Sequence, residues 1–273
     1  MSRPDDPLAE ALAAAGLDTV DGAFAYQGGQ ELAKPSLRGR RRTRIELTGR
    51  SGARHVLYLK RYDPEPLAAR LKRWWTYGLG AGPAGVEVDN IRRARQAGLE
   101  TMEAVAFGQE RGPLGPGRGY TIVSAVPGEA LERRVASYLA SAGPDAGSRL
   151  ADELASLVRR LHQAGFVHRD LYAGHIFLDD SAGRPRLYLI DLARMFRPRW
   201  RVFRWRVKDL AQLKFSMPPQ WVHRHWGDLL AAYLTGGGEG ELDRYNRSVD
   251  RKAAAIARRH ARKVARMGMG PRQ

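Results

Sequence analysis

The sequence predicts an α+β protein with two lobes, a small antiparallel β-sheet lobe followed by a mainly helical lobe. Strand patterns, with one helix among them, occupy the region from Lys34 to Val126. After the break Pro127-Gly128-Glu129 the apolar residues follow a helical period instead. The predicted divisions are an N-terminal extension at 1–31, the sheet lobe at 32–126, the helical lobe at 127–250 and a basic tail at 251–273.

Composition limits the class of protein. The chain has 273 residues, of which 43% are hydrophobic and 27% charged, as in a soluble globular protein with a sizeable core. No apolar run approaches the roughly 20 residues that a membrane span needs, and the first residues lack the pattern of a signal peptide. With no cysteine, the chain can form neither a disulfide nor a thiolate metal site. These features favour a cytoplasmic protein.

The formal net charge of +17 is large for this length. Such a charge attracts polyanions, among them nucleotides, nucleic acid, an anionic membrane face or a phosphorylated acceptor. An Arg-rich composition with no role in binding would explain the excess equally well. Charge alone therefore does not choose among these partners.

The sheet lobe is expected to contain short elements. An Ala-rich helix is predicted from Pro7 to about Gly16, and the turn signal Thr48-Gly49-Arg50-Ser51-Gly52 predicts a hairpin. The predicted strands are Ile45–Leu47, His55–Lys60, Met102–Phe107 and Tyr120–Val126.

Two charged residues of this lobe are candidates for a buried pair. By the two-residue alternation, Val56, Tyr58 and Lys60 share one strand face, so Lys60 either points inward to an anionic partner or lies at the rim. A helix is predicted from Gly85 to Gly98, with Glu87 in its first turn. Glu87 is either exposed and favoured by the helix dipole, or turned inward to pair with Lys60.

A mixed segment lies between Pro64 and Pro83 and contains Leu71-Lys72-Arg73-Trp74-Trp75-Thr76-Tyr77. Basic and aromatic residues together suit a membrane interface or an acceptor groove. The other interpretation is that they pack a loop against the body of the protein.

One helix of the second lobe is strongly periodic. A stripe at i, i+4, i+7, i+8 and i+11 predicts a helix that ends at Gly165, formed by Leu150, Leu154, Leu157, Val158 and Leu161. Ser148 is its expected N-cap, and His162 is expected to be a surface or packing residue.

The rest of this lobe is predicted to be two short strands and then helices. The strands end near Leu178 and Asp191, and helical patterns run from Val207 onward, with Asp209 near a helix start. Gly236-Gly237-Gly238 interrupts them. The tail from Arg251 to Gln273 contains no acidic residue and is either a helix on an anionic surface or a frayed end.

Two segments of the second lobe carry most of the chemistry. The first is Val167-His168-Arg169-Asp170-Leu171-Tyr172-Ala173-Gly174-His175-Ile176-Phe177-Leu178, and the second is Leu187-Tyr188-Leu189-Ile190-Asp191-Leu192-Ala193-Arg194. Carboxylates at the ends of short apolar strands suggest a metal–phosphate site. Together with an inward Lys and a helical Glu upstream, they are in the order that phosphoryl transfer needs.

The segment from His168 to Leu178 resembles the bacterial lipopolysaccharide kinases that phosphorylate Kdo or heptose in the inner core, a branch of the protein-kinase-like fold. His168-Arg169-Asp170 is similar to the catalytic-loop triplet of that fold, and His175 stands where protein kinases have Asn. Ile190-Asp191-Leu192-Ala193-Arg194 is similar to the metal-binding segment, and Lys208-Asp209-Leu210 to the start of the helix that supports the loop. The likeness extends roughly from Leu32 to Ser216.

The resemblance implies ATP and magnesium, or manganese, as cofactors. It implies that Lys60, held by Glu87, contacts the α- and β-phosphates, and that backbone groups from Ser124 to Val126 bind adenine. It further implies that Asp191 and His175 lie at the metal and phosphate side. The implied acceptor is lipopolysaccharide core or a similar anionic glycan, with peripheral contact to an anionic membrane at the inner membrane face.

The resemblance also assigns roles around the acceptor. Asp170 would orient and deprotonate the acceptor hydroxyl, and Arg169 would brace the catalytic loop. His168 and Asp209 would support the loop backbone. Because magnesium prefers oxygen ligands, His175 is expected to hold Asp170 or a phosphate oxygen by hydrogen bond rather than to contact the metal.

The sequence departs from the protein-kinase pattern in three places. The nucleotide-covering loop Ser36–Arg42 has only Gly39 where a run of glycines is usual, so its arginines either grip phosphate or leave the loop open. Neither Phe-Gly after Asp191 nor a later Ala-Pro-Glu is present, which argues against a regulated protein kinase.

Three functions remain open from the sequence. They are the glycan kinase, a kinase of a protein or small-molecule acceptor with the same catalytic residues, and a degenerate kinase fold that only binds. A nucleic-acid binder is disfavoured, and the sequence does not give the oligomeric state. The basic–aromatic run Arg194–Arg206 is interpreted either as a solvated face with core anchors or as part of a cleft for an acidic sugar or membrane.

Overall fold

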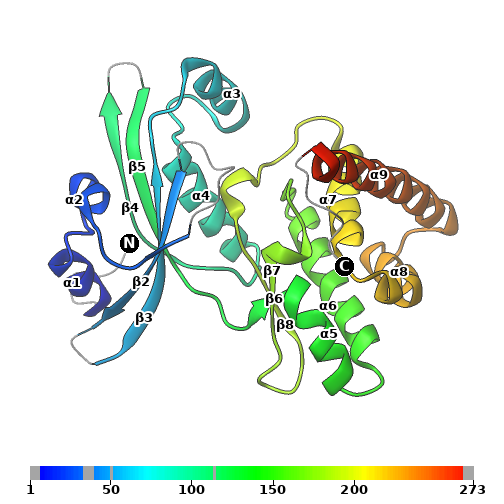
Figure 1. The fold of residues 1–273 in the computed structure, drawn as a ribbon. Coiled ribbons are helices and arrows are strands. Elements are labelled where there is room, and N and C mark those ends of the chain that lie inside the picture. Colours follow the sequence, from blue (N-terminus) through cyan, green and yellow to red (C-terminus); the bar gives the residue numbers. More distant parts are fainter. Residues whose placement is uncertain (1–6, 33–39, 50–51, 113–114, 267–273) are drawn as a thin grey trace. The chain divides into compact units, whose positions relative to one another are not determined.

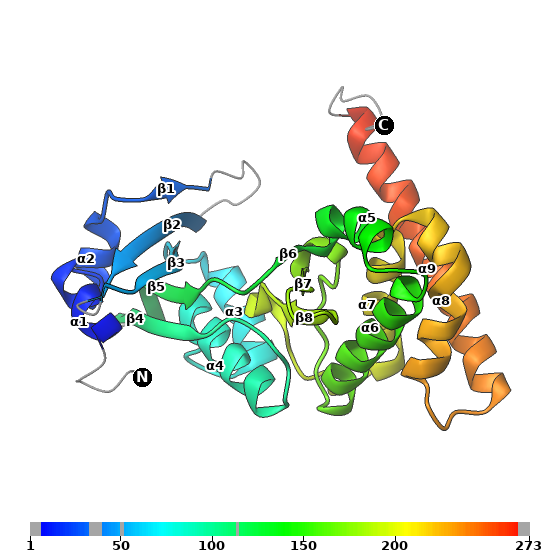
Figure 2. The same ribbon diagram turned by 90° about the horizontal axis from the view of Figure 1, so that it is seen from below.

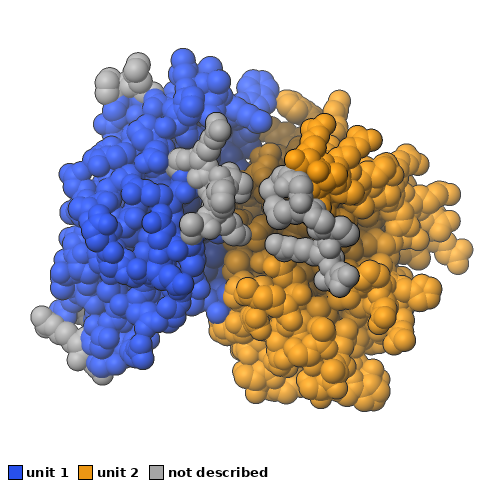
Figure 3. Space-filling view, viewed as in Figure 1, with its two compact units in different colours: residues 1–96, 101–126 blue, residues 97–100, 127–273 orange. Residues whose placement is uncertain are grey.

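The computed structural model describes residues 7–32, 40–49, 52–112 and 115–266. The chain forms two compact units, which Figure 3 distinguishes by colour. Unit 1 comprises Met1–Gln96 and Thr101–Val126, and unit 2 comprises Ala97–Glu100 and Pro127–Gln273. The predicted α+β class is confirmed, because unit 1 is built on an antiparallel sheet and unit 2 is mainly helical.

Unit 1 contains a five-stranded sheet in the order β1-β2-β3-β5-β4, with every neighbouring pair antiparallel. The predicted hairpin is present, since Thr48 of β2 pairs with Arg54 of β3. The strands are β1 (Gln30–Glu31), β2 (Arg40–Thr48), β3 (Arg54–Tyr62), β4 (Ala104–Gly112) and β5 (Gly115–Ser124).

Helices cover both faces of this sheet (Figure 1). Leu12 and Leu17, from the region of the first two helices, pack in one apolar cluster with Leu57 and Leu59 of β3. Because side chains alternate along a strand, Lys60 points to the opposite face, where α4 lies. The helices are α1 (Pro7–Ala14), α2 (Val20–Ala25), α3 (Leu67–Tyr77) and α4 (Pro83–Gln96).

The mixed segment between Pro64 and Pro83 forms a helix, α3, rather than a loop packed on the body. None of the residues of α3 is buried, and Trp75 is 80% exposed. The following helix agrees with the prediction to within two residues at each end. Gly98 lies just beyond it with φ of 72°, the left-handed conformation that favours glycine after a helix.

Unit 2 combines a small antiparallel sheet, in the order β6-β7-β8, with five α-helices among its described residues. Its strands are β6 (Glu129–Ala130), β7 (Ile176–Asp179) and β8 (Arg186–Leu189). Its helices are α5 (Leu131–Ser141), α6 (Ala146–Gln163), α7 (Val202–Ser216), α8 (Pro219–Tyr233) and α9 (Glu239–Arg266). Each of the two predicted site segments contains a short helical turn. The turns are Ala173–His175, after Tyr172, and Leu192–Arg194, after Asp191.

The apolar stripe of α6 is buried as predicted, each of its five residues being at most 1% exposed. Ser148 is not the N-cap. The helix begins at Ala146, after Asp145, and the side chain of Asp145 makes no capping hydrogen bond. Ala146 is buried, and Gly147 packs so closely against His225 that a Cβ would lie 2.2 Å from its Nε2. Packing against α8 therefore extends the helix beyond the position that capping chemistry favours.

Asp209 was predicted to lie near the start of a helix, and this prediction is wrong: α7 begins at Val202, so Asp209 lies in its middle. Aromatic packing stabilises the earlier turns: Trp205 contacts Phe196 and Phe203 contacts Tyr245, with ring centroids 5.1 and 4.8 Å apart. Part of the basic–aromatic run thus belongs to a helix with core anchors.

The basic tail is helical as far as the structure describes it. Residues 251–266 continue α9, and residues 267–273 lie outside the described part. Figure 2 shows the C-terminal part of α9 extending beyond the other helices of unit 2. No helix among the described residues is both long and apolar enough to cross a membrane.

Candidate active site

The part of the site in unit 1 is a buried ion pair between Lys60 of β3 and Glu87 of α4. Lys60 is 7% exposed and Glu87 is fully buried, so the inward alternative holds for both residues. Glu87 also accepts hydrogen bonds from the Tyr62 hydroxyl and, at 3.3 Å, from Thr121 Oγ1. Burial, and then the charge of Glu87, raise the pKa of Tyr62 well above its usual value, so its hydroxyl remains a donor. Three donors therefore fix this carboxylate.

The predicted adenine-binding residues lie at the end of β5. The Ser124 N–H donates to Glu103 O at 2.9 Å, and Ser124 Oγ accepts from the Glu103 N–H at 2.9 Å. The Ala125 N–H donates to Val56 O at 3.0 Å. These bonds connect Ser124 and Ala125 to neighbouring backbone, whereas Val126, the last residue of unit 1, donates in none of them.

The predicted nucleotide-covering loop is only partly described. Residues 33–39, which include Gly39, lie outside the described residues. Arg40, Arg41 and Arg42 form the start of β2 rather than a loop. The Arg40 guanidinium lies over the Tyr62 ring, 4.9 Å from its centroid.

In unit 2, side chains of α7 bind the backbone of residues 168–173, the segment whose sequence resembles a catalytic loop. Asp209 is fully buried and accepts from the N–H groups of His168 and Arg169, at 2.6 and 2.8 Å. Further along α7, Gln212 Oε1 and Ser216 Oγ accept from the N–H groups of Leu171 and Ala173, at 3.3 and 2.8 Å. The sequence reasoning identified Asp209 but missed Gln212 and Ser216. Their spacing of three and seven residues from Asp209, on one face of the helix, was the available signal.

The conformation of Arg169 is unusual. Its φ is 74°, in the left-handed region that non-glycine residues rarely adopt. Its guanidinium lies over the rings of Phe196 and Trp205, 5.3 and 5.6 Å from their centroids, and its carbonyl accepts from Lys208. Burial lowers the pKa of Lys208, although nearby carboxylates oppose the effect. These contacts hold the backbone turn that immediately precedes Asp170.

Asp170 is partly exposed, and its Oδ2 forms an ion pair with Arg194 at 2.6 Å. Arg194 belongs to the short turn after Asp191, so it connects the two carboxylate segments. The sequence reasoning included Arg194 in the Asp191 segment but did not predict this pairing. The guanidinium donates to Oδ2 of Asp170 and so orients this carboxylate.

His175, in the same segment as Asp170, faces Asp191 of the second segment. Its Nδ1 is 2.7 Å from the carbonyl of Asp170, so this nitrogen carries the proton, and Nε2 is 3.8 Å from Asp191 Oδ2. The expected hydrogen bond to Asp170 is therefore present, through the backbone carbonyl. Asp191 itself has φ of 60°, a left-handed turn that ends the β8 segment.

His168 connects the same two segments from the interior. It is fully buried, and its Nε2 donates to the carbonyl of Ile190 at 2.9 Å. The Ile190 N–H donates in turn to the carbonyl of His175. Burial lowers the pKa of His168, which keeps the ring neutral. His162 is buried as well, with Nδ1 2.8 Å from the Tyr233 hydroxyl and Nε2 3.4 Å from Asp209.

The donor set suits a divalent cation that is shared with phosphate. Among the described residues no group of three His, Asp or Glu side chains could hold a metal by itself. The Asp191 carboxylate supplies one hard oxygen ligand, with His175 Nε2 beside it. Magnesium is commonly held by one or two carboxylates plus substrate phosphates and water, so these residues fit magnesium only together with a bound nucleotide.

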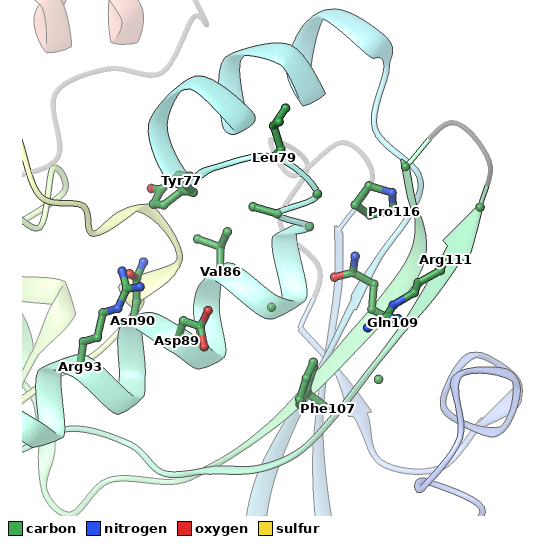
Figure 4. A pocket seen from close by; sticks show the side chains of 17 residues that line it. Tyr77, Leu79, Val86, Asp89, Asn90, Arg93, Phe107, Gln109, Arg111 and Pro116 are labelled. Atoms are coloured by element: carbon green, nitrogen blue, oxygen red, sulfur yellow. The ribbon is translucent and has the colours of Figure 1, made fainter.

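One hollow of unit 1 lies apart from these residues. It has a volume of about 680 Å³ and lies between the end of α3, α4 and the β4–β5 hairpin (Figure 4). Lys60, Glu87, Ser124 and Val126 do not line it. It is therefore distinct from the predicted nucleotide site.

Comparisons with known proteins show which chains are similar to this one. The sequence profile of the lipopolysaccharide kinase (Kdo/WaaP) family matches residues 26–233. Lipopolysaccharide core heptose(I) kinase WaaP from Pseudomonas aeruginosa is 34% identical over 74% of each chain. The protein of the same description from Escherichia coli is 31% identical over 66% of this chain and 68% of its own. A solved structure, WaaP in complex with acyl carrier protein, matches with a TM-score of 0.62 and 26% identity, covering 87% of this chain and 92% of its own.

Proposed function

Because the chain belongs to the lipopolysaccharide kinase (Kdo/WaaP) family, we propose that it transfers the γ-phosphate of ATP to a sugar hydroxyl of the lipopolysaccharide inner core. One observation carries the proposal. The catalytic-loop backbone is fixed on Asp209, and the same segment brings His175 within 3.8 Å of Asp191 while Asp170 faces Arg194. A degenerate binding module would have no need of this arrangement.

In the proposed reaction the acceptor hydroxyl loses its proton to the Asp170 carboxylate. The acceptor oxygen then bonds to the γ-phosphorus, the bond to the bridging oxygen breaks, and ADP leaves. Arg194 holds the side chain of Asp170 in one rotamer. The positive charge of Arg194 would then lie beside the transferring phosphate. Arg169 contributes by fixing the turn that presents Asp170.

The nucleotide contacts are proposed for each unit separately. Lys60, fixed by Glu87, would donate to the phosphates, and the backbone at Val126, with Ser124 shaping the strand end, would receive adenine. Magnesium or manganese, held by Asp191 with His175 beside it, would neutralise phosphate charge when bound. His175 supports this site by bonding to the Asp170 carbonyl.

The proposed acceptor accounts for the charge of the protein. Inner-core glycans carry carboxylates and phosphates, and a net charge of +17 attracts them. We place the reaction at the cytoplasmic face of the inner membrane, where ATP meets a lipid-borne acceptor. Acyl carrier protein is a second candidate partner, since the solved relative is in complex with one.

A labelled phosphotransfer assay tests the proposal. Purified protein is given γ-labelled ATP and Kdo- or heptose-bearing core oligosaccharide, and transfer is expected to fall by at least roughly a hundredfold in Asp170→Ala and in Asp191→Ala. Asp152→Ala, which removes an exposed carboxylate of α6, is the matched control. Unchanged transfer in both site variants would reject these assignments, and transfer only to protein or aminoglycoside acceptors would support the other kinase function.

A further inference from the structure

Helix α3 presents apolar side chains to solvent along its whole length. Leu67, Leu71 and Trp75 are 63%, 55% and 80% exposed, and Leu79, just beyond the helix, is 89% exposed. Residues four positions apart lie on one helix face, so the three helical residues form a continuous stripe. Eight residues of helix extend the stripe over about 12 Å. No residue of α3 is buried.

The helix is attached to unit 1 through other residues. Trp74 packs against the start of β5, where a Cβ on Gly115 would lie 3.0 Å from its ring. Arg73 forms an ion pair with Glu65, and Arg70 Nε donates to the Glu65 carbonyl at 2.8 Å. Trp74 therefore connects α3 to the sheet, the two arginines bind Glu65, which precedes the helix, and the apolar stripe takes part in none of these contacts.

The charged side chains within α3 are all basic, and one of them, Arg73, is paired with Glu65 just before the helix. The sequence of α3, Leu67–Tyr77, contains Arg70, Lys72 and Arg73 but no acidic residue. Lys72 is exposed beside the stripe. Leucine and tryptophan on one face with lysine and arginine around them are typical of helices that lie in the headgroup region of an anionic bilayer. The long basic side chains can extend to phosphates while the apolar face enters the lipid.

The hollow next to α3 adds to the basic surface (Figure 4). Tyr77 and Leu79, from the C-terminal end of the helix, line it together with Arg93 of α4 and Arg111 of β4. Asp89 also lines it, but its Oδ1 is engaged by Arg92 at 3.4 Å. Phosphates next to the inserted helix would therefore meet cations on this side of it as well.

We propose that α3 docks unit 1 on an anionic phospholipid bilayer, with Leu67, Leu71 and Trp75 in the lipid and Lys72 among the headgroups. The occupant is the bilayer itself rather than a protein, because a narrow convex stripe with surrounding cations matches a fluid anionic surface. The docking would bring the enzyme to its lipid-borne acceptor, and in that respect the inference rests on the proposed function.

Vesicle flotation with the full-length protein tests the proposal. We expect binding to phosphatidylglycerol-containing vesicles and much weaker binding to phosphatidylcholine vesicles. The double variant Leu71→Ser/Trp75→Ser should lose roughly tenfold or more in vesicle affinity, because burial of a large apolar side chain changes an equilibrium by that order. Both side chains are exposed, so circular dichroism and the melting temperature should be unchanged.

Trp200→Ser is the matched control, since Trp200 is 69% exposed but belongs to unit 2. Its vesicle affinity should equal that of the unmodified protein. Equal affinity of the double variant, or a loss confined to Trp200→Ser, would overturn the assignment to α3. So would a dimer that the double variant dissociates, or capture of acyl carrier protein through α3 without vesicle binding. Phosphotransfer to soluble oligosaccharide is measured separately, and its absence would reject the proposed function while leaving the vesicle result intact.

Discussion

Replacement of Asp209 by asparagine tests the claim that α7 holds the catalytic loop. The carboxylate is fully buried and accepts from two backbone N–H groups, at 2.6 and 2.8 Å, one on each oxygen. Asparagine keeps one acceptor oxygen and places an NH₂ group against the other donor. One buried N–H is then orphaned, at a cost of about 1–3 kcal/mol, and the remaining bond loses charge assistance worth about 1 kcal/mol.

The free energy of unfolding should therefore fall by roughly 2–4 kcal/mol in Asp209→Asn. Urea titration followed by tryptophan fluorescence measures it, because Trp205 lies on the same helix as Asp209. Asp228→Asn, at an exposed position of α8, is the control and should change stability by less than about 0.5 kcal/mol. A loss below about 1 kcal/mol in Asp209→Asn would refute the assignment of these bonds as anchors of the loop.

Three further predictions concern other parts of the protein. Glu87→Gln should raise the KM for ATP roughly tenfold or more in steady-state kinetics, because Lys60 loses its charged partner. Glu46→Gln, at an exposed position of β2, should leave the KM unchanged. Burial lowers the pKa of His168, so the unfolded chain binds this proton at higher pH than the folded chain, and stability should decline as pH falls below about 6.5. Unfolding titrations between pH 8 and 5, spanning about that value, should show a smaller decline in His168→Gln. Leu154→Ala should cost about 2–5 kcal/mol by thermal or urea unfolding, and a cost near zero would contradict its burial in the α6 core.

The features that the sequence predicted best depend on the local period of apolar residues along one helix or strand. The helical stripe identified α6, because that pattern is local and strongly apolar. Alternation along a single strand allowed Lys60 to point inward but left the strand rim as an alternative, and the structure shows the inward position. The ordered segments around Asp170 and Asp191 also allowed the two carboxylates to be identified as a site. Their roles in phosphate transfer stay predictions.

The remaining features depend on contacts that no local pattern encodes. Arg194, which pairs with Asp170, follows a left-handed turn at Asp191, a conformation that a non-glycine residue adopts only when surrounding structure imposes it. The early start of α7 depends on rings from distant segments. α3 was not recognised as a helix because its apolar residues face solvent, whereas periodicity arguments assume that an apolar face is buried.

The three donors around Glu87 have a consequence for how Lys60 behaves when its surroundings change. A buried carboxylate with a single cationic partner would lose all its compensation if that cation turned away. Here the hydroxyls of Tyr62 and Thr121 remain on Glu87. The ammonium group has three hydrogens, so Lys60 can direct one or two of them to a phosphate without leaving an uncompensated charge in the core. Because Tyr62 and Thr121 also donate to Glu87, Lys60 is held in place and still has hydrogens for a second partner.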